Sequence, residues 1–322
     1  MASTSNITLL YLIKHHSPQA FKDYRILLAN TYITQLMVII TTCCMQQRFL
    51  EANNTMGLLP IGPVRYLGPS ASFAFYNFYN GCQVNVLWSL MLSMHFRRSL
   101  IKMKGVTRKQ LVRNLVVCYI ASLNLLLSPY IPAVDFEHVT KRVIEAYPEY
   151  RLEFYGPIGG FTSTSDLIYT FNTAILLSSM VYPLLIFYWR SKILQTLDQS
   201  QSFSAKTVES TKRMIHALTF QSMLILLAYS TTSIYFITIQ VTGIEGTLRM
   251  MSQITKRGFT IMEYLHLALA SFPCLADPLS TIYFVAPYRL WVEKKVLRIR
   301  HAKKTTSDTN SSLHVSRISN TL

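Results

Sequence analysis

Residues Leu167–Trp189 read LIYTFNTAILLSSMVYPLLIFYW and contain no charged side chain. About 20 helical residues cross the hydrocarbon core of a bilayer, so this stretch is long enough to span it. Because lipid offers the backbone no hydrogen-bond partner, an isolated spanning segment must be a helix. The stretch therefore predicts a membrane-spanning helix.

Five more stretches share this length and apolar character. They lie near Ile26–Gln46, Ser70–Met94, Leu111–Ile131, Ile215–Val241 and Gly258–Val285. The composition agrees, since 14% of the residues are charged whereas soluble domains carry about 25%. We predict an all-α fold, in which residues 26–285 form a polytopic transmembrane helix bundle with six full spans.

A shorter apolar run precedes these spans. Residues Ile7–Ile13 read ITLLYLI and are followed by Lys14-His15-His16-Ser17-Pro18. The run is too short to cross a bilayer. We interpret it as the last two turns of a truncated first span, and we assign residues 1–25 to this stub and a cytoplasmic loop.

The basic residues alternate from one connection to the next. Of 31 Lys and Arg residues, 23 lie in the segment 1–25, in the connections after Ser70–Met94 and after Leu167–Trp189, and in the tail. Cytoplasmic loops of membrane proteins retain Lys and Arg, so these segments are predicted to be cytoplasmic. The net charge of +16 therefore indicates a lipid bilayer as the partner and not nucleic acid.

The remaining connections face outward in this topology. Asn53-Asn54-Thr55 lies in one of them and matches the N-glycosylation acceptor pattern at Asn53. The longest connection, 132–165, contains the turn-forming run Gly156-Pro157-Ile158-Gly159-Gly160. We consider two interpretations for it, a lid over an outer pocket and a plain solvated loop. The tail, 286–322, is basic and is predicted to be partly disordered from Lys303 onward.

Ionisable groups inside spans are functional candidates, because their burial in lipid is costly. Glu263, His266 and Asp277 share one helical face with Ala270 and Pro273, given about 100° of rotation per residue. Glu263 and His266 either hydrate at the membrane edge or contact a ligand. Asp277 lies deeper and precedes Pro278, which favours a conformational switch.

The span Ser70–Met94 carries amides within an aromatic stretch. Asn77, Asn80 and Gln83 are the candidates. Amides in a span either hydrogen-bond to neighbouring helices or contact a ligand, and the sequence leaves both interpretations open.

Signatures of catalysis and metal binding are absent from the sequence. It contains no GxSxG, HExxH or P-loop motif. Glu263 and His266 have the spacing of di-iron bundles, but that motif occurs only once. The five cysteines all lie in apolar runs. We predict neither an enzyme nor a bound metal or cofactor.

Several motifs resemble the nematode serpentine receptors of class delta. They are His16-Ser17-Pro18 followed by Tyr24-Arg25-Ile26-Leu27-Leu28-Ala29-Asn30-Thr31, then Gly62-Pro63-Val64-Arg65-Tyr66-Leu67-Gly68-Pro69, Pro273-Cys274-Leu275-Ala276-Asp277-Pro278, and Ile282-Tyr283-Phe284-Val285-Ala286-Pro287-Tyr288-Arg289. The resemblance covers nearly the whole chain. It implies a seven-span G-protein-coupled receptor for environmental chemicals in the plasma membrane of sensory neurons.

The resemblance also implies roles for residues. Asp277-Pro278 and Tyr283 take the place of the rhodopsin-like NPxxY switch, together with Pro273. Arg97, Arg98, Lys212 and Arg213 would face a heterotrimeric G protein. Two departures stand out: Val64 stands where the family leads us to expect cysteine, and His95-Phe96-Arg97-Arg98 replaces an acid–Arg–Tyr triplet.

The sequence therefore predicts a chemosensory receptor that binds a small molecule from outside and signals to a G protein. Two alternatives remain open at this stage. One is a six-span transporter or channel with both termini inside, which the even number of full spans favours. The other is a non-functional truncated receptor.

Overall fold

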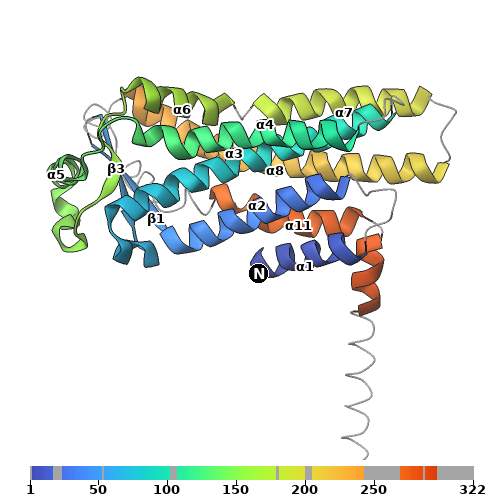
Figure 1. Ribbon diagram of the computed structural model, residues 1–322, viewed down its shortest axis with the longest axis horizontal. Helices are drawn as coiled ribbons and strands as arrows, with labels where there is room; N and C mark the ends of the chain where they lie inside the picture. The colour runs from blue at the N-terminus through green and yellow to red at the C-terminus, as the bar shows by residue number, and fades with distance from the viewer. Residues whose placement is uncertain are drawn as a thin grey trace, which may run out of the picture.

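Long helices that lie side by side dominate the computed structural model, which describes residues 2–16, 24–52, 54–101, 107–178, 181–199, 205–242, 269–285 and 287–295 (Figure 1). The helices of the bundle are α1 (Ala2–His15), α2 (Tyr24–Met45), α3 (Pro69–Ile101), α4 (Arg108–Leu127), α6 (Leu167–Ser178), α7 (Val181–Gln199), α8 (Ala205–Thr242) and α11 (Pro273–Phe284). The predicted fold class, a polytopic helical bundle, is confirmed.

The helices overrun the predicted spans mainly on the basic side. α3 continues to Ile101 and α8 begins at Ala205, because a helix can extend into water with polar residues after its apolar part has crossed the membrane. By length and composition, three described helices qualify as spans, at Tyr24–Met45, Arg108–Tyr130 and Leu167–Leu197, and a bent pair raises this to four. The helix α3 is long enough at 33 residues, but its amides and hydroxyls make it more polar.

The segment interpreted as the last two turns of a truncated span is a docked helix, α1. α1 contains 14 residues, or about 21 Å at 1.5 Å per residue. Leu9, Leu12 and Ile13 are buried, in a hydrophobic cluster that includes Leu27 of α2 and Tyr288. Apolar burial of this kind holds the short helix against the bundle.

The connections predicted to face outward fold into a cap and are not plain loops. Strands β1 (Gln47–Ala52), β2 (Thr55–Pro60) and β3 (Gly159–Phe161) form an antiparallel sheet in the order β1-β2-β3. The amphipathic helix α5 (Phe136–Ala146) buries Val139 and Val143 against this sheet. Figure 1 shows the sheet and α5 together at one end of the bundle.

The prediction of a turn at Gly159-Gly160 was wrong, because both residues belong to β3. A Cβ on Gly160 would lie 2.0 Å from the carbonyl oxygen of Met56, and one on Gly159 would lie 2.5 Å from that of Pro69. Only glycine permits this approach of β3 to β2 and to the start of α3.

The expected outer cysteine is replaced by Val64, which is buried, and all five cysteines are free. Strand pairing therefore anchors this connection without a disulfide.

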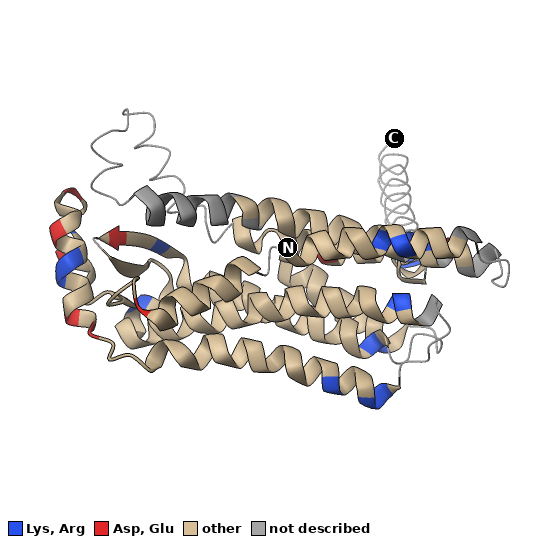
Figure 2. Ribbon diagram, turned by 90° about the horizontal axis from the view of Figure 1, so that it is seen from above, with Lys and Arg blue, Asp and Glu red and all other residues tan. Residues whose placement is uncertain are grey.

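The charged residues separate along the bundle, with most of the basic ones at one end. Figure 2 shows basic residues gathered at the end opposite the sheet, where α3 and α7 end and α4 and α8 begin. The cap end carries acidic residues among its basic ones. After α11 the chain turns by 94° into a helix at 287–295, which lies beside the end of α1 (Figure 1).

Candidate functional site

A buried hydrogen bond links α2 to α11 in the middle of the bundle. Asp277 is 0% exposed, and its Oδ2 accepts a 2.7 Å hydrogen bond from Nε2 of Gln35. Within the described part of the chain, Asp277 Oδ1 and Gln35 Oε1 have no partner. Because burial strengthens a hydrogen bond between polar groups, this contact ties α2 to α11 within the packing.

Gln221 of α8 binds the same part of α11. Its Nε2 lies 2.8 Å from Thr281 Oγ1 and 3.3 Å from the carbonyl oxygen of Asp277. The Tyr32 hydroxyl lies 2.5 Å from Thr281 Oγ1 and 3.3 Å from Gln221 Nε2. Three helices thus meet through a single buried polar network.

α1 satisfies a carbonyl group that Pro278 leaves without its helical partner. Proline has no N–H, so Pro278 cannot donate to the carbonyl four residues earlier, which is that of Cys274. Asn6 of α1 donates to this carbonyl oxygen from Nδ2 at 2.9 Å. Asn6 is 0% exposed and also donates to the carbonyl of Ala2. The short first helix therefore completes the hydrogen bonding of α11 at its proline.

Only some of the residues predicted to form the switch are buried in the bundle. Pro273, Asp277 and Pro278 are buried on the inner face of α11. Tyr283 is 63% exposed and points away from that network. Thr281, four residues after Asp277, lies on the same helical face, whereas position 283 is turned away by about 200° from position 281. The tyrosine hydroxyl of the network comes from Tyr32 of α2, which the sequence analysis missed.

A second buried network joins α2, α3 and α4. Asn30 donates from Nδ2 to Asn85 Oδ1 at 2.9 Å and to Ser89 Oγ at 2.7 Å. The Tyr119 hydroxyl donates to Asn30 Oδ1. Sequence alone offered one signal for these residues, namely polar side chains within otherwise apolar stretches.

The predicted ligand-contacting amides occupy different environments. Gln83 is buried, and its Nε2 donates to Tyr79 Oη at 2.8 Å and to the Ala270 carbonyl at 3.3 Å. Asn77 is buried, with Nδ2 unpaired among the described residues, and Asn80 is half-buried. Glu263, His266 and the predicted glycosylation site Asn53 lie outside the described residues.

The residues predicted to face a G protein differ in their exposure, from buried to exposed. Arg97 is 6% exposed, with its guanidinium carbon 4.4 Å from the ring centroid of Tyr24. Arg98 and Lys212 are half-buried, and Arg213 is exposed and pairs with Glu209. In this conformation Arg97 is directed to the start of α2 by a cation–π contact.

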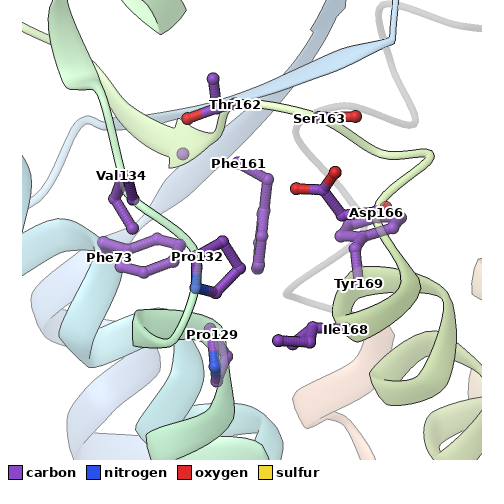
Figure 3. Close-up of a pocket in the computed structure, with 12 residues that line it drawn as sticks. Phe73, Pro129, Pro132, Val134, Phe161, Thr162, Ser163, Asp166, Ile168 and Tyr169 are labelled. Atoms are coloured by element: carbon purple, nitrogen blue, oxygen red, sulfur yellow. The ribbon is translucent and has the colours of Figure 1, made fainter.

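Aromatic rings close the outer end of the bundle. Phe161 of β3 packs edge-on against Phe73 of α3 at 4.9 Å and against Tyr169 of α6 at 5.0 Å between ring centroids. A small cleft of about 20 Å³ lies beside this cluster. Figure 3 shows Phe161 on one side of the cleft, Asp166 and Tyr169 on the other, and Pro129 and Ile168 below.

Comparisons with known proteins agree with this architecture. A sequence model of the family described as "Serpentine type 7TM GPCR chemoreceptor Srd" matches residues 1–294. Serpentine receptor class delta-59 of Caenorhabditis elegans is 28% identical over 305 residues, covering 94% of this chain and 90% of that protein. Serpentine receptor class delta-33 of the same organism is 29% identical over 296 residues, with coverages of 90% and 81%.

Among solved structures, the chain resembles the crystal structure of squid rhodopsin. The TM-score is 0.61 at 11% sequence identity, and the alignment covers 92% of this chain and 82% of rhodopsin. At this identity the likeness shows the fold alone. The family model, which matches residues 1–294, shows that the chain belongs to the serpentine seven-transmembrane G-protein-coupled chemoreceptors of class delta.

Proposed function

We propose that this protein is a chemosensory receptor that binds a small environmental molecule from outside the cell and activates a heterotrimeric G protein. The membership of the family supports a receptor of this type. We further propose that it acts in the plasma membrane of sensory neurons. Asn77, Asn80, Gln83, Glu263 and His266 are the proposed ligand contacts of the bundle.

The observation that carries the proposal is the network centred on Asp277. Gln35, Gln221 and Asp277 belong to three different helices, and each contact depends on how those helices pack. A second packing of these helices would exchange the present partners for others, because each hydrogen bond holds only at a donor–acceptor distance of up to about 3.2 Å. A ligand that binds the second packing more tightly than the first would shift the population toward it.

The docked α1 supports a folded receptor over a non-functional fragment. Its buried leucines and the Asn6 contact complete the packing of α2 and α11. The basic end of the bundle in Figure 2 supplies the positively charged surface that a G protein would meet, with Arg98, Lys212 and Arg213 as the proposed contacts.

Reconstitution tests the proposal. The purified chain in lipid nanodiscs, mixed with heterotrimeric G protein, should accelerate nucleotide exchange when a mixture of volatile and water-soluble odorants is added. The matched control is a variant with Arg98, Lys212 and Arg213 all changed to Glu, which keeps the outer end intact. Ligand-evoked current in a bilayer without G protein would instead identify a transporter or channel.

A further inference from the structure

The cleft beside Phe161 contains a carboxylate with unusual surroundings. Asp166 immediately precedes α6, where an aspartate ordinarily accepts hydrogen bonds from the first helical amides. Asp135 does so before α5, accepting from the backbone N–H groups of Glu137 and His138 at 3.0 Å each. Within the described part of the chain, the carboxylate of Asp166 accepts no such bond and forms no ion pair. It extends beside Tyr169 toward the cleft (Figure 3).

The rest of the cleft lining is aromatic, apolar or neutral. Phe73, Phe161 and Tyr169 supply rings, and Thr162 and Ser163 supply hydroxyls. None of the described residues that line the cleft is basic. A carboxylate beside aromatic faces is the combination that stabilises an organic cation, through charge attraction and cation–π contacts.

A second carboxylate adds negative potential on the same side of the sheet. The register pairs Glu51 with Met56 and Met56 with Phe161, so these three side chains share one face of the sheet. The Tyr169 hydroxyl donates to Met56 Sδ at 3.4 Å, which places Glu51 within electrostatic range of that ring. Burial raises the pKa of Glu51 to about 7, as expected for a carboxylate that no described cation neutralises.

We propose that the cleft between β3 and α6 binds the ammonium group of a small protonated amine. Asp166 is its counter-ion, Phe161 and Tyr169 are its cation–π partners, and the ionised fraction of Glu51 adds negative potential at longer range. The volume of about 20 Å³ admits a group of roughly the size of one water molecule. The ammonium group therefore enters the cleft and the carbon chain of the amine extends out of it. This inference deepens the proposed function, on which it rests, by naming the class of ligand.

Thermal unfolding tests the binding step alone, without G protein. The purified full chain in nanodiscs is titrated with n-butylammonium chloride and, separately, with n-butanol, at an ionic strength held constant with sodium chloride. A ligand that binds only the folded state raises the unfolding temperature, and above its dissociation constant the rise follows the logarithm of its concentration. We expect n-butylammonium to do so, and n-butanol of the same chain length to leave the midpoint unchanged.

Three variants identify the residues. Asp166→Asn should raise the dissociation constant of n-butylammonium at least tenfold, and Glu51→Gln should raise it severalfold. Glu149→Gln is the matched control, because Glu149 is an exposed acid of the same cap that does not line the cleft. The dissociation constant of n-butylammonium for Glu149→Gln should stay within about twofold of the wild-type value. If Asp166→Asn does not fold, Phe161→Leu replaces it, with an expected weakening of about threefold or more through loss of one cation–π contact.

The outcomes separate this inference from the proposed function. Equal stabilisation by n-butanol and n-butylammonium, or a wild-type dissociation constant in Asp166→Asn, would overturn the inference while odorant-driven nucleotide exchange still supported the receptor. Binding of n-butylammonium without nucleotide exchange under any ligand would support the cleft and overturn the signalling proposal.

Discussion

The amide of Gln35 on α2 donates a 2.7 Å hydrogen bond to the carboxylate of Asp277 on α11, although 242 positions of sequence separate the two residues. Both side chains are 0% exposed. A contact of this kind reports on the relative positions of two helices, because it breaks when either helix shifts by about 1 Å.

Asp277→Ala tests the signalling role of this contact. The change leaves the buried Gln35 amide without an acceptor, at a cost of about 1–3 kcal/mol. We expect G-protein nucleotide exchange to fall at least tenfold, while surface expression stays close to that of the wild type. Asp277→Asn, which keeps the size of the side chain and one acceptor oxygen, is the matched control and should retain more activity. Wild-type signalling by Asp277→Ala would contradict a switch role.

Two tyrosine substitutions separate the buried network from the exposed surface of α11. Tyr32→Phe removes the hydroxyl that meets Thr281 and Gln221. We expect the free energy of unfolding to fall by about 1–2 kcal/mol. Tyr283→Phe, at a 63% exposed position, should change it by less than about 0.5 kcal/mol. Thermal unfolding in nanodiscs measures the stability of both variants. Equal losses of stability in Tyr32→Phe and Tyr283→Phe would show that the hydrogen bonds of the Tyr32 hydroxyl contribute nothing to stability.

Asn6→Leu tests the contact between α1 and the proline of α11. The variant leaves the Cys274 carbonyl without a donor, which should lower the free energy of unfolding by about 1–3 kcal/mol. Thr4→Leu introduces the same side chain on the exposed face of α1 and serves as the control. If Asn6→Leu and Thr4→Leu unfold at the same temperature, the Asn6 hydrogen bond contributes nothing to stability.

Glu51 should make the stability of the cap depend on pH. Burial raises its pKa from 4.5 to about 7, so the folded state binds a proton that the unfolded state releases. Stability from this group is therefore fully present below about pH 4.5 and is lost as the pH rises to about 7. Glu51→Gln should unfold at a higher temperature than wild type at pH 8, with a smaller difference at pH 5. The same comparison with Glu149→Gln should show no such pH trend.

Epitope tags test the orientation of the whole bundle. A tag inserted near Lys104, in the basic connection, should be reached by antibody only after the cells are permeabilised. A tag between Glu149 and Arg151, in the cap, should be labelled on intact cells. External labelling near Lys104 would refute the topology, and with it the assignment of outer and inner faces.

Sequence alone predicted the helices, their orientation and the family, because each of these depends on local stretches of chain. The apolar composition of a run such as Leu167–Trp189 is enough to predict a span. The Lys and Arg content of each connection predicts by itself whether that connection is cytoplasmic. The deep position of Asp277 beside Pro278 was visible for the same reason.

Only the tertiary structure decided which side chains meet. Gly159 and Gly160 were expected in a turn, but pairing with Leu58 and Gly57, about 100 residues away in sequence, places them in a strand. Tyr283 was predicted as a switch residue beside Asp277 and Pro278, but it is 63% exposed, and the buried tyrosine hydroxyl beside Thr281 comes from Tyr32 of α2. The Asn6 hydrogen bond and the cleft beside Asp166 arise in the same way. Such contacts depend on the mutual positions of elements distant along the chain, and no local pattern of residues records those positions.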